Sequence, residues 1–230
     1  MALLARLGPR AAFRAGRWSS AGALFVYAAA FSLAYVRIGV AVGALLAFGA
    51  VQATMIAWAL HSGERPRPAE WLGIAMAAAG VAVLFAHRVS APDPLGALMM
   101  VTAGVAWGIY SLIGRSAVRP LDTTAGNFAR ALPFTLAMSL ASGAPQVTLR
   151  GAVLAAVSGA IASGVGYSLW YAALPALTAT RAAVVQLSVP VVAAAGGVLL
   201  LGESLTLRLV ASATAILGGV ALAIAGRRAT

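Results

Sequence analysis

A chain of 230 residues that is 62% hydrophobic and only 9% charged cannot cover a water-facing surface, because soluble domains carry roughly 25% charged residues. All sixteen of its cations are arginine and its net charge is +11, which could indicate nucleic-acid binding. These arginines fall at the ends of apolar segments, so we expect a membrane protein without a nucleic-acid partner. The absence of cysteine excludes disulfides and thiolate metal sites.

The apolar segments are long enough to cross a bilayer, which takes about 20 mostly apolar residues. In chain order we predict eight of them, at residues 19–36, 39–60, 69–86, 94–114, 124–142, 152–174, 181–201 and 207–226. The linkers between them are too short to hold a soluble domain. The expected fold class is therefore an all-α polytopic membrane protein with about eight transmembrane helices.

Residues 1–18 form a basic segment with four arginines and no acid. This composition is typical of a targeting presequence, but also of a cytoplasmic segment held inside by its charge, and we favour the second interpretation. With the N-terminus inside, eleven arginines lie on the cytoplasmic side and four outside, while Arg130 lies within a span. The count predicts cytoplasmic termini at both ends, in the plasma (inner) membrane.

An ordered set of Tyr, Arg and Gly-Glu residues recurs in two stretches, about 20–88 and about 164–227. The matches, at an offset of 144 and then 139 residues, are Tyr27 with Tyr171, Arg37 with Arg181, Gly63-Glu64 with Gly202-Glu203, and Gly80-Val81 with Gly219-Val220. The first copy starts inside and the second outside, so the copies have opposite orientations. Inverted repeats are typical of secondary transporters, with the substrate site near the midplane between the copies.

The second copy contains the run Arg181-Ala-Ala-Val-Val-Gln-Leu-Ser-Val-Pro190, then Leu201-Gly-Glu203 and Gly218-Gly-Val220. With these motifs in this order, the chain resembles the EamA-type family of the drug/metabolite transporter superfamily. The resemblance covers about residues 20–227 and implies two inverted repeats of five helices. Measured against that pattern, the domains are a basic segment at 1–18, a partial first repeat of three helices at 19–88 and a second repeat of five at 94–227. The chain thus looks N-terminally shortened, either naturally or through a misassigned start codon.

Arg130 is the one charge well inside a predicted span, and an ionisable group there is a functional candidate by default. Asn127, three residues earlier, shares its helix face, so both side chains could contact one polar ligand. A guanidinium suits a carboxylate or a phosphate. The alternative is that Arg130 extends to the membrane interface.

Amide and aromatic side chains supply the other candidate contacts. Gln52 and Gln186 lie in equivalent helices of the two copies, and Pro190 frees a backbone carbonyl near Gln186; the alternative is hydrogen bonding between helices. The aromatic side chains could stack on a solute, or could only pack and anchor the helices. The predicted substrate-binding residues are Gln52, Trp107, Tyr110, Asn127, Arg130, Tyr167, Tyr171 and Gln186.

Other chemistry has little support in the sequence. We interpret Glu64 and Glu203 as turn residues rather than proton-coupling groups, and we place all five acids in linkers. Both histidines, His61 and His87, are also placed in linkers, so we expect no metal centre and no serine hydrolase with a histidine base.

The sequence therefore predicts a transporter of small metabolites or drug-like solutes, with efflux as the favoured direction. We expect no enzyme activity and no cofactor. The expected partners are a small-molecule substrate and the lipid bilayer, with a homodimer as one assembly to test. The alternative is a truncated membrane fragment or an assembly subunit that does not transport.

Overall fold

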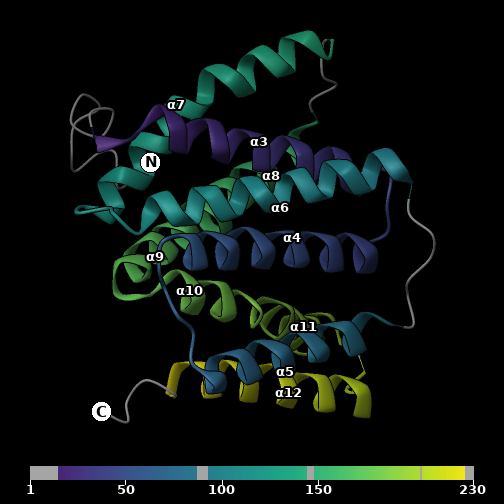
Figure 1. Cartoon of the computed structure of the whole chain (residues 1–230). Coiled ribbons are helices and arrows are strands. Elements are labelled where there is room, and N and C mark those ends of the chain that lie inside the picture. The colour runs from purple at the N-terminus through teal and green to yellow at the C-terminus, as the bar shows by residue number, and fades with distance from the viewer. Residues whose placement is uncertain (1–14, 87–92, 144–147, 203, 226–230) are drawn as a thin grey trace. The chain divides into compact units, whose positions relative to one another are not determined.

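The structure is a computed structural model, and it describes residues 15–86, 93–143, 148–202 and 204–225 (Figure 1). Every regular element within these residues is helical. The helices are α3 Trp18–Tyr35, α4 Val40–His61, α5 Pro68–Phe85, α6 Pro94–Gly114, α7 Pro120–Ala141, α8 Leu149–Val157, α9 Gly166–Ala173, α10 Ala179–Gln186, α11 Val189–Leu201 and α12 Leu207–Ala225. A π-helical stretch, Ser158–Val165, joins α8 to α9, and a 3-10 turn, Leu174–Ala176, follows α9.

These helices account for the eight predicted spans, with α8 to α9 forming one span and α10 with α11 another. Within the described residues, seven of the eight are long and apolar enough to cross a membrane. The remaining helix, α7, has a more polar first half, which includes Asp122, Asn127 and Arg130. The predicted class, an all-α polytopic membrane protein, is confirmed.

Glycines in the left-handed region end two of the spans. Gly63 (φ 82°) follows α4, and Gly202 (φ 67°) caps α11 and donates its N–H to the carbonyl oxygen of Gly197. Glycine takes this conformation without the steric cost that a Cβ would add. These are the two Gly-Glu turn points that match between the copies, although Glu203 lies outside the described residues.

Near Pro190, which was predicted to free a backbone carbonyl, the helix is interrupted. α10 ends at Gln186 and α11 begins at Val189. The carbonyl oxygen of Ser188 accepts hydrogen bonds from the next turn, while Pro190 has no N–H with which to extend α10. Gln186, the last residue of α10, therefore lies next to the non-helical backbone of residues 187–188.

The contacts divide the chain into two compact units. The first unit holds residues up to Ala29 and Ile109–Leu177, and the second holds Ala30–Gly108 and the residues from Thr178 on. In the first unit α7 packs on α9. In the second unit α4 and α5 of the first copy pack on α10 and α12 of the second copy.

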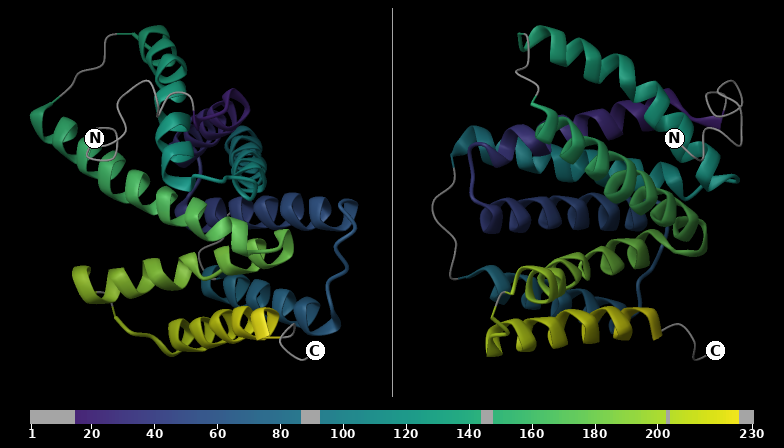
Figure 2. Two further views of the ribbon diagram at one scale, coloured as in Figure 1. Left: turned by 90° about the vertical axis from the view of Figure 1, so that its left-hand side faces the viewer. Right: turned by 180° about the vertical axis from the view of Figure 1, so that it is seen from behind.

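Helices α5 and α12 lie side by side in the second unit (Figures 1 and 2). A Cβ atom on Gly73 would lie 2.5 Å from the carbonyl oxygen of Gly219, and one on Gly80 would lie 2.7 Å from Cγ1 of Ile216. The residue numbers run in opposite directions, so the two helices are antiparallel. Small residues let helix backbones approach closely in lipid. An inverted repeat requires this orientation of α5 and α12, and the repeat itself stays a prediction.

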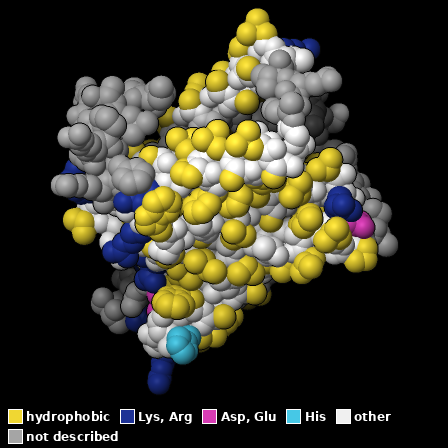
Figure 3. Space-filling view, turned by 90° about the horizontal axis from the view of Figure 1, so that it is seen from above, with side chains coloured by type: hydrophobic (Ala, Val, Ile, Leu, Met, Phe, Trp, Pro, Cys, Tyr) yellow, Lys and Arg dark blue, Asp and Glu magenta, His cyan; other side chains and the backbone are white. Residues whose placement is uncertain are grey.

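Large apolar side chains remain exposed on the helices. Leu140, Leu199 and Leu207 are among those more than four-fifths exposed. On the face drawn in Figure 3, hydrophobic side chains predominate and the arginines gather toward the margins. Such a surface would be an aggregation hazard in water, but lipid tails are as apolar as leucine and cover it without cost.

Candidate functional site

Three helices of the second unit hold a cluster that we call the glutamine cluster: Gln52, Met55, Trp107 and Gln186. The indole Nε1 of Trp107 on α6 donates to Oε1 of Gln186 on α10. Nε2 of Gln186 donates to Sδ of Met55 on α4 at 3.0 Å and to the carbonyl oxygen of Ala182 at 3.3 Å. The Gln186 amide therefore ties together helices from both copies.

Gln52 is held in the same place but is only partly satisfied. Its Nε2 donates to the carbonyl oxygen of Ala183 on α10 at 2.6 Å. Its Oε1 is buried and receives no hydrogen bond from the described residues. Leaving such an acceptor unpaired costs about 1–3 kcal/mol. Within the glutamine cluster, this oxygen is therefore the acceptor that a hydrogen-bond donor on a bound molecule could pair with.

The first unit holds a second group, the tyrosine cluster: Tyr27, Tyr110, Asn127, Tyr167 and Tyr171. The rings of Tyr110 and Tyr171 are fully buried, with centroids 4.6 Å apart. The Tyr171 hydroxyl donates to the backbone carbonyl of Tyr110 at 3.0 Å and accepts from Nδ2 of Asn127 at 3.4 Å. The Tyr167 ring lies 6.4 Å from Tyr27 and 6.3 Å from Tyr110.

Arg130 on α7 is also in the first unit, and its side chain is almost wholly buried. Its guanidinium carbon lies 5.6 Å from the centroid of the Trp18 ring, at the start of α3. A cation within about 6 Å of a tryptophan face is attracted to it. Asn127 turns the same way, because its Oδ1 accepts from the backbone N–H of Arg17 at 3.0 Å. The shared face predicted for Asn127 and Arg130 thus meets Arg17 and Trp18 at the start of α3.

The role of Arg130 can be tested by substitution. If the guanidinium binds an anionic solute, Arg130→Ala should lower solute affinity on the order of tenfold to a hundredfold, since a hydrogen bond to a charged group contributes about 1.5–3 kcal/mol. Arg130→Lys keeps the charge but loses the fork, so it should lose less. The measurement is uptake or efflux in vesicles, with the inserted protein quantified separately. Normal transport by Arg130→Ala would leave stacking on Trp18 as the role of this residue.

The eight predicted site residues thus fall into two groups. Gln52, Trp107 and Gln186 meet in the second unit. The remaining five, all in the first unit, are Tyr110, Asn127, Arg130, Tyr167 and Tyr171. Whether any of them contacts a solute stays a prediction.

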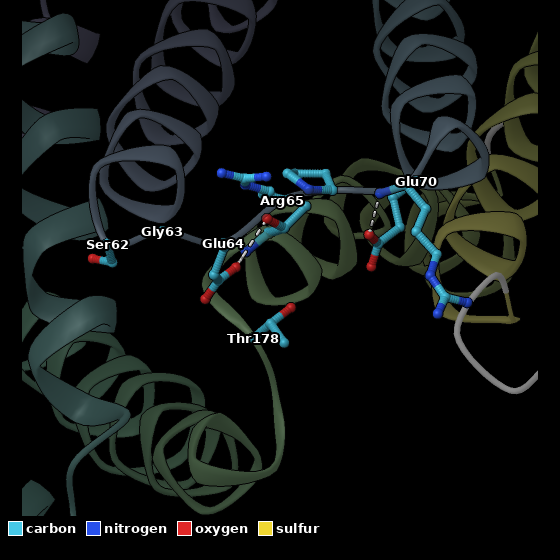
Figure 4. Close-up of a pocket in the computed structure, with 9 residues that line it drawn as sticks. Ser62, Gly63, Glu64, Arg65, Glu70 and Thr178 are labelled. Atoms are coloured by element: carbon cyan, nitrogen blue, oxygen red, sulfur yellow. Dashed lines mark hydrogen bonds between the residues drawn. The ribbon is translucent and has the colours of Figure 1, made fainter. Parts of the chain in front are cut away.

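Glu64, directly after Gly63, does more than form a turn. Its Oε1 accepts from the N–H of Ala179 at 2.9 Å, and its Oε2 accepts from the N–H (3.2 Å) and hydroxyl (3.0 Å) of Thr180. Figure 4 shows Glu64 on the side of the pocket where Thr178 precedes α10. A carboxylate at a helix N-terminus pairs with N–H groups that have no partner within the helix. Glu64 therefore caps α10 across 115 positions of sequence and joins the two copies.

Glu70 makes a second connection between the copies. Its Oε2 accepts from the N–H of Arg67 at 2.8 Å (Figure 4), and its Oε1 lies 3.6 Å from Nε of Arg181 on α10. Nη2 of Arg181 donates to the carbonyl oxygen of Ile224 near the end of α12 at 2.9 Å. This buried ion pair links α5, α10 and α12. A pocket of about 450 Å³ lies beside it, bordered also by Arg65.

The prediction that all five acids lie in linkers is wrong. Glu70 and Asp122 lie in the first turns of α5 and α7, and both are buried. The first turn of a helix favours acids because its N–H groups and dipole attract negative charge. His61 is likewise not in a linker but is the last residue of α4, and His87 lies outside the described residues.

Sequence reasoning also missed the partners of these groups. Met55 was not a candidate, although it lies one turn from Gln52 on the same helix. Thr178 and Thr180 were not recognised as the start of a capped helix, although Thr178 Oγ1 accepts from the N–H of Arg181 at 3.2 Å. A threonine before an apolar run is an N-cap signal and could have identified the beginning of α10.

In the part of the chain that the structure describes, seven long apolar helices, with side-chain amides hydrogen-bonded between them, define a polytopic membrane protein. Residues 94–225, more than half of the chain, match the EamA-like transporter family. The chain belongs to this family, whose members are membrane transporters rather than enzymes.

Three curated relatives match the chain, and two of them are named as transporters. An uncharacterized protein of Pseudomonas aeruginosa is 51% identical over 99% of this chain and 80% of its own length. Uncharacterized transporters of Bacillus subtilis and Archaeoglobus fulgidus are 29% and 30% identical over 78% and 75% of this chain. The match spans 63% of the length of each of these two proteins.

A solved crystal structure of another protein shares the fold. Its TM-score is 0.78, at 23% sequence identity, over 93% of this chain and 78% of that one. The likeness supports the helical arrangement and carries no information on substrate.

Proposed function

We propose that this protein is a permease for small metabolites or drug-like solutes, with the solute bound between the two copies of the repeat. The observation that carries the proposal is the buried Oε1 of Gln52, which lacks a hydrogen bond within the described residues. Gln52 and Gln186 come from α4 and α10, which belong to equivalent parts of the two copies. A solute with an ammonium, amide or hydroxyl group would supply the missing donor.

The surroundings of Gln52 suit a small organic solute. Trp107 is oriented by its bond to Gln186, so its indole is a fixed flat surface. Met55 is a soft, adaptable neighbour, and methionine is common at surfaces that accept varied partners. A few placed polar groups among apolar and aromatic walls are the usual composition of a small-molecule site.

The surplus of arginines on one side favours cytoplasmic termini in the plasma membrane, and we propose efflux from the cytoplasm. Everted and right-side-out membrane vesicles loaded with the same solute distinguish efflux from uptake.

The test of the proposed site uses the purified chain in liposomes, with ethidium and radiolabelled amino acids as probes. At least one probe should cross faster than in protein-free liposomes. Gln52→Leu should then reduce that flux at least tenfold, because a solute donor would face a hydrocarbon side chain in place of its acceptor. The flux is measured at equal amounts of inserted protein.

A matched control is Thr102→Ala on α6, which should transport normally. Thr102 is exposed and its hydroxyl donates to its own helix, at the carbonyl oxygen of Leu98. Equal flux in Gln52→Leu and Thr102→Ala would remove Gln52 from the site. If no probe crosses faster than in empty liposomes, an assembly subunit without transport becomes the better interpretation.

A further inference from the structure

The first unit contains a pocket of about 440 Å³ that belongs to neither cluster. It lies between the start of α3 and the connection from α6 to α7. Arg17 and Arg119 line it, together with the hydroxyl-bearing residues Ser20, Ser116 and Thr123. No acid is among its lining residues within the described part of the chain.

The charge of this pocket is positive even after its neighbours are counted. Arg119 pairs with Asp122, which lies in the first turn of α7. The Asp122 side chain is 11% exposed. Two guanidinium groups against one carboxylate leave one positive charge in excess. The guanidinium fork is suited to carboxylate and phosphate oxygens because it offers parallel N–H donors.

Ser20 marks the buried side of the pocket. It is fully buried, and its Oγ has no hydrogen bond with the described residues. The Tyr171 hydroxyl lies near it but gives its own proton to the carbonyl oxygen of Tyr110. The Ser20 hydroxyl can therefore turn its proton either toward the Tyr171 oxygen or toward an oxyanion in the pocket.

The backbone that carries Arg17 is fixed. A Cβ atom on Gly16 would lie 2.3 Å from the carbonyl carbon of Gly126 and 2.6 Å from the nitrogen of Asn127. The neighbouring N–H of Arg17 donates to Asn127 at 3.0 Å. The segment before α3 is thus pressed onto α7, and this holds one wall of the pocket in place before any ligand arrives. Such preorganisation lowers the entropic cost of binding.

We propose that this pocket binds a small oxyanion, a carboxylate or phosphate group, between Arg17 and Arg119, with the Ser20 hydroxyl as the inner donor. The group is either part of a soluble anion or the headgroup of an anionic lipid. The inference rests on the pocket alone and does not require that the protein transports a solute.

The test is calorimetric titration of the full chain in nanodiscs of phosphatidylcholine, with inorganic phosphate and succinate as probes at constant ionic strength. We expect saturable binding of at least one probe. Arg17→Ala and Arg119→Ala should each weaken it on the order of tenfold, as the loss of a charge-assisted hydrogen bond implies. Ser20→Ala should weaken binding several-fold, because the inner donor to the oxyanion is removed, while the free protein keeps its fold and its Tyr171–Tyr110 hydrogen bond.

The matched control is Arg150→Ala, which removes an exposed arginine on α8 in the same unit that does not line the pocket. It should bind the probes as the parent does.

Phosphatidylglycerol in the nanodisc should compete with phosphate if the natural source is a lipid headgroup, and should have no effect if the source is soluble. The proposal is overturned if the parent shows no saturable binding, or if the Arg17 and Arg119 variants titrate like Arg150→Ala. Calorimetry in nanodiscs measures binding without transport. A negative result would therefore reject the oxyanion site and leave the proposed permease function untouched.

Discussion

Gly73→Ala should lower the free energy of unfolding by about 1–3 kcal/mol, the usual cost of overpacking. The new methyl group would lie 2.5 Å from the carbonyl oxygen of Gly219 and 2.9 Å from the nitrogen of Ala223. Both atoms belong to the backbone of α12, so no side-chain rotation relieves the clash. Helices α5 and α12 would have to move apart where they are in contact. Thermal or denaturant unfolding in detergent, followed by circular dichroism, measures the loss.

Gly49→Ala on α4 is the matched control, because a Cβ at Gly49 meets nothing within 4 Å. Alanine is the better helix former by about 1 kcal/mol in water, so this variant should unfold at the same or a higher free energy. The expected results therefore differ in sign for the same chemical change. If both variants behave alike, close contact between α5 and α12 is not what holds this pair.

Arg181→Met should destabilise the protein by about 3–5 kcal/mol, because it leaves the buried Glu70 carboxylate without its cation. The two side chains are 18% and 7% exposed, and Nε of Arg181 lies 3.6 Å from Oε1 of Glu70. The same change also removes the donor to the carbonyl oxygen of Ile224. Replacing both partners, as Glu70→Leu with Arg181→Met, should recover much of the loss, since no unpaired charge remains.

An exposed ion pair of the same length provides the control. Arg37 and Asp93 are also 3.6 Å apart, but their side chains are 47% and 39% exposed. Exposed pairs contribute about 0–1 kcal/mol, so Arg37→Met should have little effect on unfolding. A cost for Arg181→Met no larger than that for Arg37→Met would show that burial adds nothing to this contact.

The spans could be predicted from sequence because lipid offers no hydrogen bonds to the backbone, so long apolar runs must be helical. Residue chemistry pointed to Pro190 as a place where the helix loses a hydrogen bond, and to turns at Gly63-Glu64 and Gly202-Glu203, but the left-handed conformation of the two glycines was not predicted. The prediction of spans was less accurate at helix starts. α7 begins at Pro120, four residues before the predicted span, because proline fits the first turn of a helix and a hydropathy pattern does not register that.

The partners of the polar residues could not be predicted in the same way. A linear sequence shows that Glu64 follows a helix, but not that its acceptor oxygens meet the start of α10. Gln52 and Gln186 were predicted as a pair because they occupy equivalent helices. Their hydrogen bonds to Ala183 and Trp107 depend on how α4, α6 and α10 pack, and the repeat offset carries no information on that packing.

The antiparallel contact between α5 and α12 has a consequence for the timing of synthesis. Gly73 and Gly219 are 146 residues apart, and a ribosome that adds 5–20 residues per second needs roughly 7 to 30 s to cover that distance. During that interval the glycine face of α5 lies in the bilayer without its partner helix. Lipid exerts no hydrophobic force between helices, so α5 can wait there where a comparable face in water would aggregate. The second unit is therefore completed only when α12 has entered the membrane, however early its first helices are inserted.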